Sequence, residues 1–172
     1  MAEKDEKTME IEEDTQKGKF LTFVLDKEVY AIEIKFVTEI IDIQPITEVP
    51  ELPAYIKGII NLRGKIIPVM VVRIRFKKKP VDYNDRTCVI VIDDENISLG
   101  LIVDNVSEVL SIPDENLVPP PEMNRGSENR YIKAIGKVEN GVKLILDCEK
   151  LVNDKEVEAI SHTQNNNIEI IS

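Results

Sequence analysis

The chain has 172 residues and a formal net charge of −10 at pH 7. This length is enough for one domain, or for two small joined subdomains, with a hydrophobic core that needs no disulfides. The acidic balance argues against binding to nucleic acid or to anionic membranes, because both need clustered cations. The one basic run, Lys77–Lys79, is too short to reverse that balance, and we interpret it as part of a solvated linker.

Both ends of the chain are polar. Residues 1–17 carry seven acidic side chains and no apolar core, so we expect a disordered acidic tail and no signal peptide. We interpret residues 153–172 as a polar C-terminal tail, part of which could dock or form a loose helix. The longest apolar run, Ile66–Val72, is far shorter than the ~20 residues of a membrane helix. Cys88 and Cys148 lie in apolar stretches, which predicts reduced, buried thiols and a cytoplasmic protein.

Between the tails, short apolar segments alternate with turn residues, a pattern typical of a small β-barrel or sandwich. Thr87–Ile92 is apolar on both faces, as a barrel strand should be. The predicted strands, in chain order, are Phe20–Leu25, Val29–Ile34, Gly58–Leu62, Lys65–Met70, Thr87–Ile92, Ile97–Val103, Tyr131–Glu139 and Val142–Leu146. Val106, Val109, Leu110 and Ile112 add another apolar stretch.

Local signals mark the connections between these strands. The three-and-four spacing of apolar residues over Ile34–Ile41 predicts a helical turn, and Pro53 is well placed to start another turn. Pro68 has no amide donor, which predicts that its strand is an edge strand or carries a bulge there. Asn140-Gly141 is a strong hairpin signal. Asp147 is predicted to be the N-cap of a short helix that ends at Val152.

A weak internal repeat is visible. Gly58–Phe76 and Ala134–Val152 share the order strand, glycine turn, apolar strand and short helix. Two hairpin-plus-helix units favour two similar subdomains over a single sandwich.

The sequence lacks the usual signs of catalysis. The single histidine, His162, lies in the polar C-terminal tail, so no histidine of the body can serve a nucleophilic triad. A zinc site would need His162, Cys88 and Cys148 to converge from three distant segments, and the glycines are too scattered for a phosphate loop. The 32 acidic residues are explained more simply by a solubilising surface. We therefore predict a protein that is not an enzyme and that uses no cofactor or metal.

The segment Pro53–Val69, with Asn61-Leu62-Arg63-Gly64 at its centre, is the most distinctive part of the chain. With the segments around it, it resembles the CheW family of chemotaxis adaptors over about residues 19–152. The other matching pieces, in family order, are Tyr30-Ala31-Ile32, Val37-Thr38-Glu39-Ile40, Ile46-Thr47-Glu48-Val49-Pro50 and Gly100-Leu101-Ile102-Val103-Asp104.

The resemblance implies an all-β fold with short helices, in which two small five-stranded β-barrel subdomains pack together. We expect the first barrel over about residues 18–80 and the second over 81–152, with possible strand exchange between them. It also implies a non-catalytic scaffold recruited to membrane-associated receptor arrays. One face would bind the regulatory domain of the histidine kinase CheA, and another the cytoplasmic hairpin tip of a chemoreceptor.

The resemblance further implies that a set of positions contacts the kinase or the receptor: Val37, Glu39, Gly58, Asn61, Arg63 and Val106. Arg63 beside Gly64 would present a planar, permanently charged group to a partner carboxylate or carbonyl. Alternatively, Arg63 pairs with a neighbouring acid and braces its own loop. Val37 and Val106 could equally be core residues, and Gly58 could serve a close backbone approach.

One departure from the family concerns Val71, since relatives commonly carry an aspartate N-cap at this place. A missing cap typically costs ~1 kcal/mol, so the sequence predicts that Val71→Asp stabilises the protein. Two other functions remain open. The chain could be a truncated CheV-type adaptor, or a small barrel that binds a low-molecular-weight ligand between its subdomains.

Overall fold

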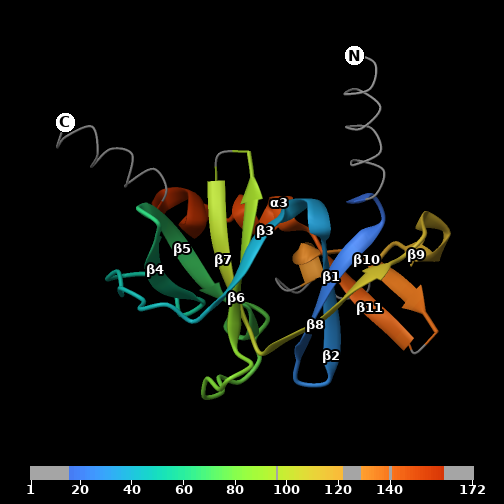
Figure 1. The fold of residues 1–172 in the computed structure, drawn as a ribbon, viewed down its shortest axis with the longest axis horizontal. Helices are drawn as coiled ribbons and strands as arrows, with labels where there is room; N and C mark the ends of the chain where they lie inside the picture. Colours follow the sequence, from blue (N-terminus) through green and yellow to red (C-terminus); the bar gives the residue numbers. More distant parts are fainter. Residues whose placement is uncertain (1–15, 96, 122–128, 140, 161–172) are drawn as a thin grey trace, which may run out of the picture.

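The computed structural model describes residues 16–95, 97–121, 129–139 and 141–160. Within these residues, eleven strands form a six-stranded sheet, in the order β8-β1-β2-β11-β10-β9, and a five-stranded sheet, in the order β3-β6-β7-β5-β4. The two sheets lie side by side (Figure 1). The strands are β1 Lys19–Leu25, β2 Glu28–Glu33, β3 Val37–Asp42, β4 Ile56–Leu62, β5 Lys65–Val71, β6 Cys88–Asp94, β7 Ile97–Val103, β8 Asn105–Ser111, β9 Leu117–Val118, β10 Ile132–Val138 and β11 Gly141–Leu146.

The hairpins follow the sequence closely, because each is set by a local turn. In β1–β2, the two-residue turn Asp26-Lys27 connects the strands, and Asp26 takes the positive φ of 56° that tight hairpins require. The pairs β6–β7 and β10–β11 are antiparallel hairpins as well, as predicted. Asn140, half of the predicted turn signal, lies outside the described residues.

The helical turn predicted over Ile34–Ile41 is wrong beyond its first residues. A single 3-10 turn, Ile34–Phe36, is followed directly by strand β3. Apolar residues three and four apart arise here because the strand carries a bulge: Val37 pairs with Ile92 and Glu39 with Val91. The bulge adds one residue and thereby imitates a helical spacing.

Pro68 lies in an interior strand, because β5 pairs with β4 on one side and with β7 on the other. The parallel pairing with β7 begins only at Val69, one residue later. On the other side Pro68 faces Ile59, whose backbone N–H and C=O bond to Thr47 instead. The proline is tolerated because no partner needs its missing amide hydrogen. The predicted edge location was therefore wrong, whereas a register shift does lie close by, where Ile56 and Gly58 face Met70 and Val69.

The internal repeat is confirmed and extends further than the sequence suggested. Strands β1 and β6, and likewise β2 and β7, are related by one constant sequence spacing (Lys19 to Cys88, Glu28 to Ile97). The same spacing relates Val37 to Val106 in β3 and β8. The hairpins β4–β5 and β10–β11 also match, with a register shift at the same place in each.

The repeats exchange strands. Hairpin β1–β2 of the first repeat joins β8, β10 and β11 of the second, whereas β6–β7 of the second repeat joins β3, β4 and β5 of the first. The linker around residue 80 therefore separates the sequence repeats, but a cut there would divide both sheets. The core strand order is the same in both, β8-β1-β2-β11-β10 and β3-β6-β7-β5-β4, and β9 is the additional sixth strand.

Neither sheet is a closed barrel. In the six-stranded sheet, the chain leaves edge strand β8, passes a 3-10 turn at Asp114–Asn116, and returns as β9 beside β10. In the five-stranded sheet, the chain leaves β3 and pairs once with β4, where Thr47 and Ile59 exchange two hydrogen bonds. The ends of each sheet are thus linked by one chain segment, not by a continuous ladder.

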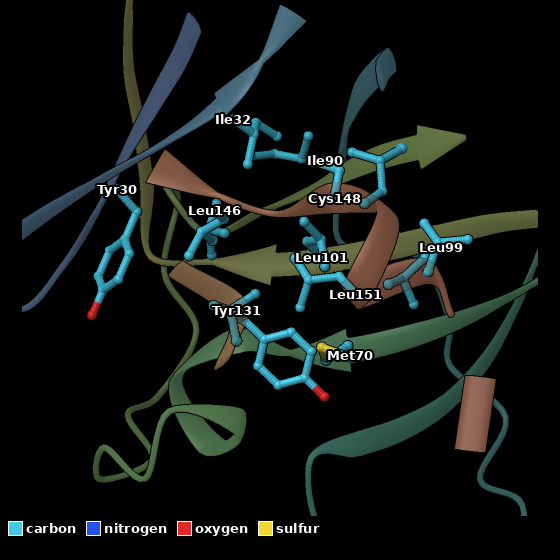
Figure 2. Close-up of a cluster of buried hydrophobic side chains, with 14 of the residues drawn as sticks. Tyr30, Ile32, Met70, Ile90, Leu99, Leu101, Tyr131, Leu146, Cys148 and Leu151 are labelled. Carbon is cyan, nitrogen blue, oxygen red and sulfur yellow. The ribbon is translucent and has the colours of Figure 1, made fainter. Parts of the chain in front are cut away.

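The largest core lies between the two sheets, and each sheet also has a smaller apolar cluster of its own. Figure 2 shows side chains from β2, β5, β6, β7 and β11 converging in the large core, with Cys148 and Leu151 of helix α3 among them. Cys148 is buried as expected, whereas Cys88 is only half-buried. Burial in this apolar setting raises the pKa of the Cys148 thiol.

Two short helices occupy equivalent places in the repeats. Helix α2, Val72–Arg75, follows β5 and has no side-chain cap at Val71. Helix α3, Cys148–Val152, follows β11, and the Asp147 carboxylate accepts a hydrogen bond from the backbone of Lys150 at 3.0 Å. Both helix starts were predicted correctly.

The segment 153–160 packs against the body and is not part of a free tail. Residues 155–160 are helical, and both Val157 and Ile160 are buried in the large core. Buried Asp154 precedes this helix and accepts hydrogen bonds from the hydroxyls of Tyr55 and Tyr131, at 3.1 and 3.0 Å. One carboxylate thereby connects the start of β4, the start of β10 and the C-terminal helix. The segment 153–160 is too short for its apolar pattern to predict that it packs against the body.

Candidate protein-interaction site at the β4–β5 hairpin

The turn between β4 and β5 is a two-residue hairpin turn made by Arg63 and Gly64. Both have positive φ, 52° and 85°, which is the conformation of a type I′ turn. The Asn61 side chain accepts a hydrogen bond from the Gly64 amide at 2.8 Å and so fixes the turn from within. A non-glycine residue costs roughly 1 kcal/mol in this backbone region, so Arg63 is held here by its surroundings.

Arg63 forms an ion pair with Glu39 on strand β3. Strands β3 and β4 are at opposite ends of the five-stranded sheet, so this pair joins the two ends where the sheet curls round. The Arg63 side chain remains 72% exposed, whereas that of Glu39 is 26% exposed. The internal pairing left open by the sequence is therefore present, yet most of the Arg63 side chain still faces solvent. An exposed pair of this kind contributes little stability, about 0–1 kcal/mol, but it restricts where the guanidinium points.

Glu39 is positioned by the bulge in β3. Thr38, the bulged residue, donates a hydrogen bond from its hydroxyl to the carbonyl of Val91 at 3.0 Å. Val37, before the bulge, packs against the large inter-sheet core, and Ile41, after it, packs against the smaller apolar cluster of the five-stranded sheet. Residues before and after the bulge therefore pack on opposite sides of the sheet, and Glu39 can reach Arg63. One Glu39 carboxylate oxygen is buried and has no hydrogen-bond partner among the described residues.

Gly58 is buried and serves a close backbone approach. A Cβ atom at this position would lie 2.1 Å from the Thr47 carbonyl oxygen. Ile59, the next residue, exchanges backbone hydrogen bonds with Thr47 in both directions, each 2.9 Å long. Because Gly58 has no side chain, the segment after β3 can pack closely against β4, the strand that leads to Arg63.

The structure brings Glu39, Asn61 and Arg63 together, with Gly58 supporting the same hairpin. Val106 is elsewhere: it lies on β8 in the six-stranded sheet, half-buried against the large core. It is the repeat counterpart of Val37, which explains why both appeared as ambiguous apolar positions. A contact role for any of these six residues remains a prediction.

Two exposed isoleucines near the hairpin were missed from the sequence. Ile40 follows Glu39 in edge strand β3 and is 45% exposed, and Ile66 lies just after the turn in β5 and is 40% exposed. Neither had a distinguishing signal, because Ile66 is embedded in an apolar run and Ile40 was assigned to a helical turn. Large exposed apolar side chains beside a fixed cation are typical of a protein-contact surface.

A buried cation was also missed. Arg73 of α2 is 5% exposed and pairs with Asp26 at 2.7 Å and with Asp104 at 2.5 Å, and its Nε donates to the Lys79 carbonyl. Burial by itself would lower the pKa of Arg73, but the hydrogen bonds and charges of the two aspartates raise it overall. This cluster connects the β1–β2 turn with the β7–β8 junction, so it is a structural link between the two sheets.

The described residues contain no group of three or more histidine, cysteine or acidic side chains placed to hold a metal ion. No helix within the described ranges is long and apolar enough to cross a membrane.

Comparison with known proteins identifies the family. The family model described as CheW-like domain matches residues 19–156. The chain belongs to the CheW family. It is 34% identical to the chemotaxis protein CheW of Klebsiella aerogenes over 143 residues, covering 83% of this chain and 86% of that protein. It is 33% identical to the chemotaxis protein CheW of Bacillus subtilis over 138 residues, covering 80% and 88%.

A solved CheW structure has the same fold. The scaffolding protein TtCheW of Thermoanaerobacter tengcongensis matches with a TM-score of 0.71 and 34% sequence identity, over 76% of this chain and 88% of that one. The match supports the all-β CheW-like architecture expected from the sequence, with sheets of six and five strands in place of two five-stranded barrels.

Proposed function

We propose that this protein is a non-catalytic chemotaxis adaptor that couples the histidine kinase CheA to chemoreceptors. Its membership of the CheW family supports this, as do the relatives named chemotaxis proteins and the solved relative described as a scaffolding protein. In this role the protein holds kinase and receptor together in the cytoplasm, at membrane-associated receptor arrays.

The observation that carries the proposal is the hairpin at Asn61–Gly64. Arg63 is held by a rigid turn and by Glu39, yet 72% of its side chain is exposed. An arginine fixed in this way loses little further conformational freedom when it binds a partner carboxylate or carbonyl. Exposed apolar area is supplied by Ile66, which pairs with Asn61 in the hairpin, and by Ile40, which follows Glu39 in β3.

The two proposed partners are the regulatory domain of CheA and the cytoplasmic hairpin tip of a chemoreceptor. Val37, Glu39, Gly58, Asn61 and Arg63 all belong to elements of the five-stranded sheet. Val106 belongs to the six-stranded sheet, so it would contribute to a second face. Two sheets of the same strand order give the protein two comparable surfaces, which suits a scaffold that binds two proteins.

Co-sedimentation with receptor-containing membranes, and capture with immobilised CheA, test this function directly. We expect Arg63→Glu to lose binding to at least one of the two partners while its unfolding midpoint stays close to that of the original chain, because Arg63 is exposed. Arg86→Glu, a reversal of another exposed arginine in the loop before β6, is the matched control and should retain both contacts. Unchanged binding of Arg63→Glu to both partners would refute the site.

A charge exchange separates the two possible roles of Arg63. The double variant Glu39→Arg, Arg63→Glu restores an internal pair with reversed polarity. If Arg63 only braces the hairpin, the double variant should recover the binding that Arg63→Glu loses. We expect no recovery, because the exposed guanidinium is the group offered to the partner.

A further inference from the structure

The repeat places two equivalent hollows in the molecule, one beside each sheet. The hollow of the five-stranded sheet measures about 410 Å³ and is lined by residues that include Thr87, Ile102, Asp104 and Lys57. The hollow of the six-stranded sheet measures about 650 Å³, and its lining includes the repeat counterparts of these four, Gly18, Glu33, Lys35 and Lys133. Equivalent residues thus line both, but the second hollow is larger.

The smaller hollow is lined in part by the chain segment that precedes β6, the strand equivalent to β1. Pro80, Val81, Asp82 and Tyr83 all line it, a few residues before β6 begins at Cys88. The Arg73 guanidinium donates to the carbonyl of Lys79 at 2.8 Å and holds the beginning of this segment. The residues that lead into β6, the repeat counterpart of β1, therefore line this hollow.

The spacing that relates β6 to β1 also relates residues 80–83 to residues 11–14. The lining of the larger hollow begins at Gln16 and Lys17, so the chain leaves the described region at the rim of this hollow. An extended chain spans about 3.3–3.6 Å per residue, so residues 9–14 can reach any part of a hollow of this size from Gln16.

The larger hollow has the chemistry to hold an acidic, partly apolar segment. Its lining includes four lysines and two acids, and Phe20, Leu117 and Ile145 supply apolar surface. The charged residues are Lys17, Lys19, Lys35, Lys133, Glu33 and Asp114. Glu33 pairs with both Lys35 and Lys133, which leaves the cluster with an excess of positive charge in a protein that is strongly negative as a whole.

The sequence before Gln16 complements this hollow. Residues 9–14 read Met-Glu-Ile-Glu-Glu-Asp, which combines two apolar side chains with four acids. We propose that residues 9–14 bind in the lysine-lined hollow of the six-stranded sheet, as residues 80–83 do in the equivalent hollow. The acids pair with the lysine rim, and Met9 and Ile11 cover the apolar surface. Because the segment is tethered, its effective concentration is in the millimolar range, so weak contacts suffice.

This occupancy gives the acidic segment a function beyond solubility. It neutralises the lysine cluster and covers one end of the six-stranded sheet. A partner with an acidic surface could reach these lysines only by displacing residues 9–14. The inference depends on the repeat geometry and on charge, and it does not require the proposed adaptor function.

Carbodiimide cross-linking of the full chain, followed by mass spectrometry, tests the contact. This reagent joins carboxylates to amines that already touch. We expect links from Glu10–Asp14 to Lys19, Lys35 or Lys133, and their loss in about 1 M NaCl, where the Debye length falls to ~3 Å. Links spread evenly over distant exposed lysines such as Lys155 would overturn the proposal. Links between copies, detected by mixing isotope-labelled and unlabelled chains, would overturn its intramolecular form.

A matched pair of variants provides the second readout by NMR. In the full chain, neutralising the segment with E10Q/E12Q/E13Q/D14N should shift the amide resonances of Lys19, Lys133 and Ala134. Lys133→Gln in the original chain should shift resonances of residues 9–14, whereas Lys57→Gln, its counterpart at the other hollow, should not. Unmoved resonances in the neutralised variant, or equal effects of the two lysine substitutions, would refute the contact. Neither readout involves kinase or receptor, so failure here leaves the adaptor function untouched.

Discussion

Substituting Gly58 by alanine tests whether the close contact between β4 and the segment after β3 stabilises the five-stranded sheet. The new Cβ would lie 2.1 Å from the Thr47 carbonyl oxygen and 2.9 Å from its carbon. Both are backbone atoms, so no side-chain rotation can relieve the overlap, and the segment after β3 must move away from β4. That movement breaks the two 2.9 Å hydrogen bonds between Thr47 and Ile59.

The expected cost follows from these contacts. Each backbone hydrogen bond contributes about 0.5–1.5 kcal/mol net, and an L-residue at the φ of 153° adds roughly 1 kcal/mol of strain. We expect Gly58→Ala to lower the free energy of unfolding by about 2–4 kcal/mol. For a chain of this size, that corresponds to a melting temperature lower by about 5–15 °C.

Urea and thermal unfolding, followed by far-UV circular dichroism, measure this cost. Gly64→Ala is the control, because Gly64 has a positive φ of 85° and no atom within 4 Å of its would-be Cβ. It should show the backbone cost alone, about 1 kcal/mol. A Gly58→Ala variant as stable as Gly64→Ala would refute the close-approach argument. It would then leave direct partner contact as the better explanation for this glycine.

Four further predictions concern the two helix starts and the titratable side chains of Tyr55 and Cys148. Val71→Asp should destabilise the protein in urea unfolding, contrary to the sequence-based expectation, because Val71 is 8% exposed and packs in an apolar cluster; a gain in stability would show that the cap outweighs burial. Asp147→Ala should cost ~1 kcal/mol in the same assay, because it removes the cap on Lys150, and an unchanged midpoint would contradict this. Burial, and then the charge of Asp154, raise the pKa of Tyr55 to about 12. The folded protein therefore favours the protonated hydroxyl of Tyr55, and the resulting stabilisation is fully present below the ordinary tyrosine pKa of about 10. It is lost as pH rises through 12, so unfolding midpoints should fall over that window. The fall should be smaller in Tyr55→Phe. Cys148, buried in the core with a raised pKa, should react with a thiol reagent only on unfolding, and fast labelling of the native protein would contradict its burial.

The sequence predicted the local features well, because their causes are local. The β1–β2 and β4–β5 hairpins depend on two-residue turns, and the start of α3 depends on Asp147, whose carboxylate bonds three residues away. The repeat of hairpin and helix was also visible, since each copy is a continuous segment. The importance of the Asn61–Gly64 turn followed from its distinctive residues and from the family they resemble.

Other features could not be predicted, because distant segments decide them. Residues Val37–Asp42 become a strand only because β6 offers an edge to pair with, and their bulge imitates a helical spacing. Arg63 finds Glu39 only because the sheet curls until its two ends meet. Asp154 is buried between Tyr55 and Tyr131, so the segment 153–160 docks where composition predicted a tail.

The amino-acid sequence by itself therefore determined most of the strands, the hairpin turns, the Asp147 cap and the family of this protein. Tertiary structure alone decided which sheet each strand joins. Sequence neighbours β2 and β3 lie in different sheets, and so do β7 and β8, because the first hairpin of each repeat pairs with the remaining strands of the other repeat. That choice depends on apolar surfaces far apart in the chain, which no local pattern of residues records.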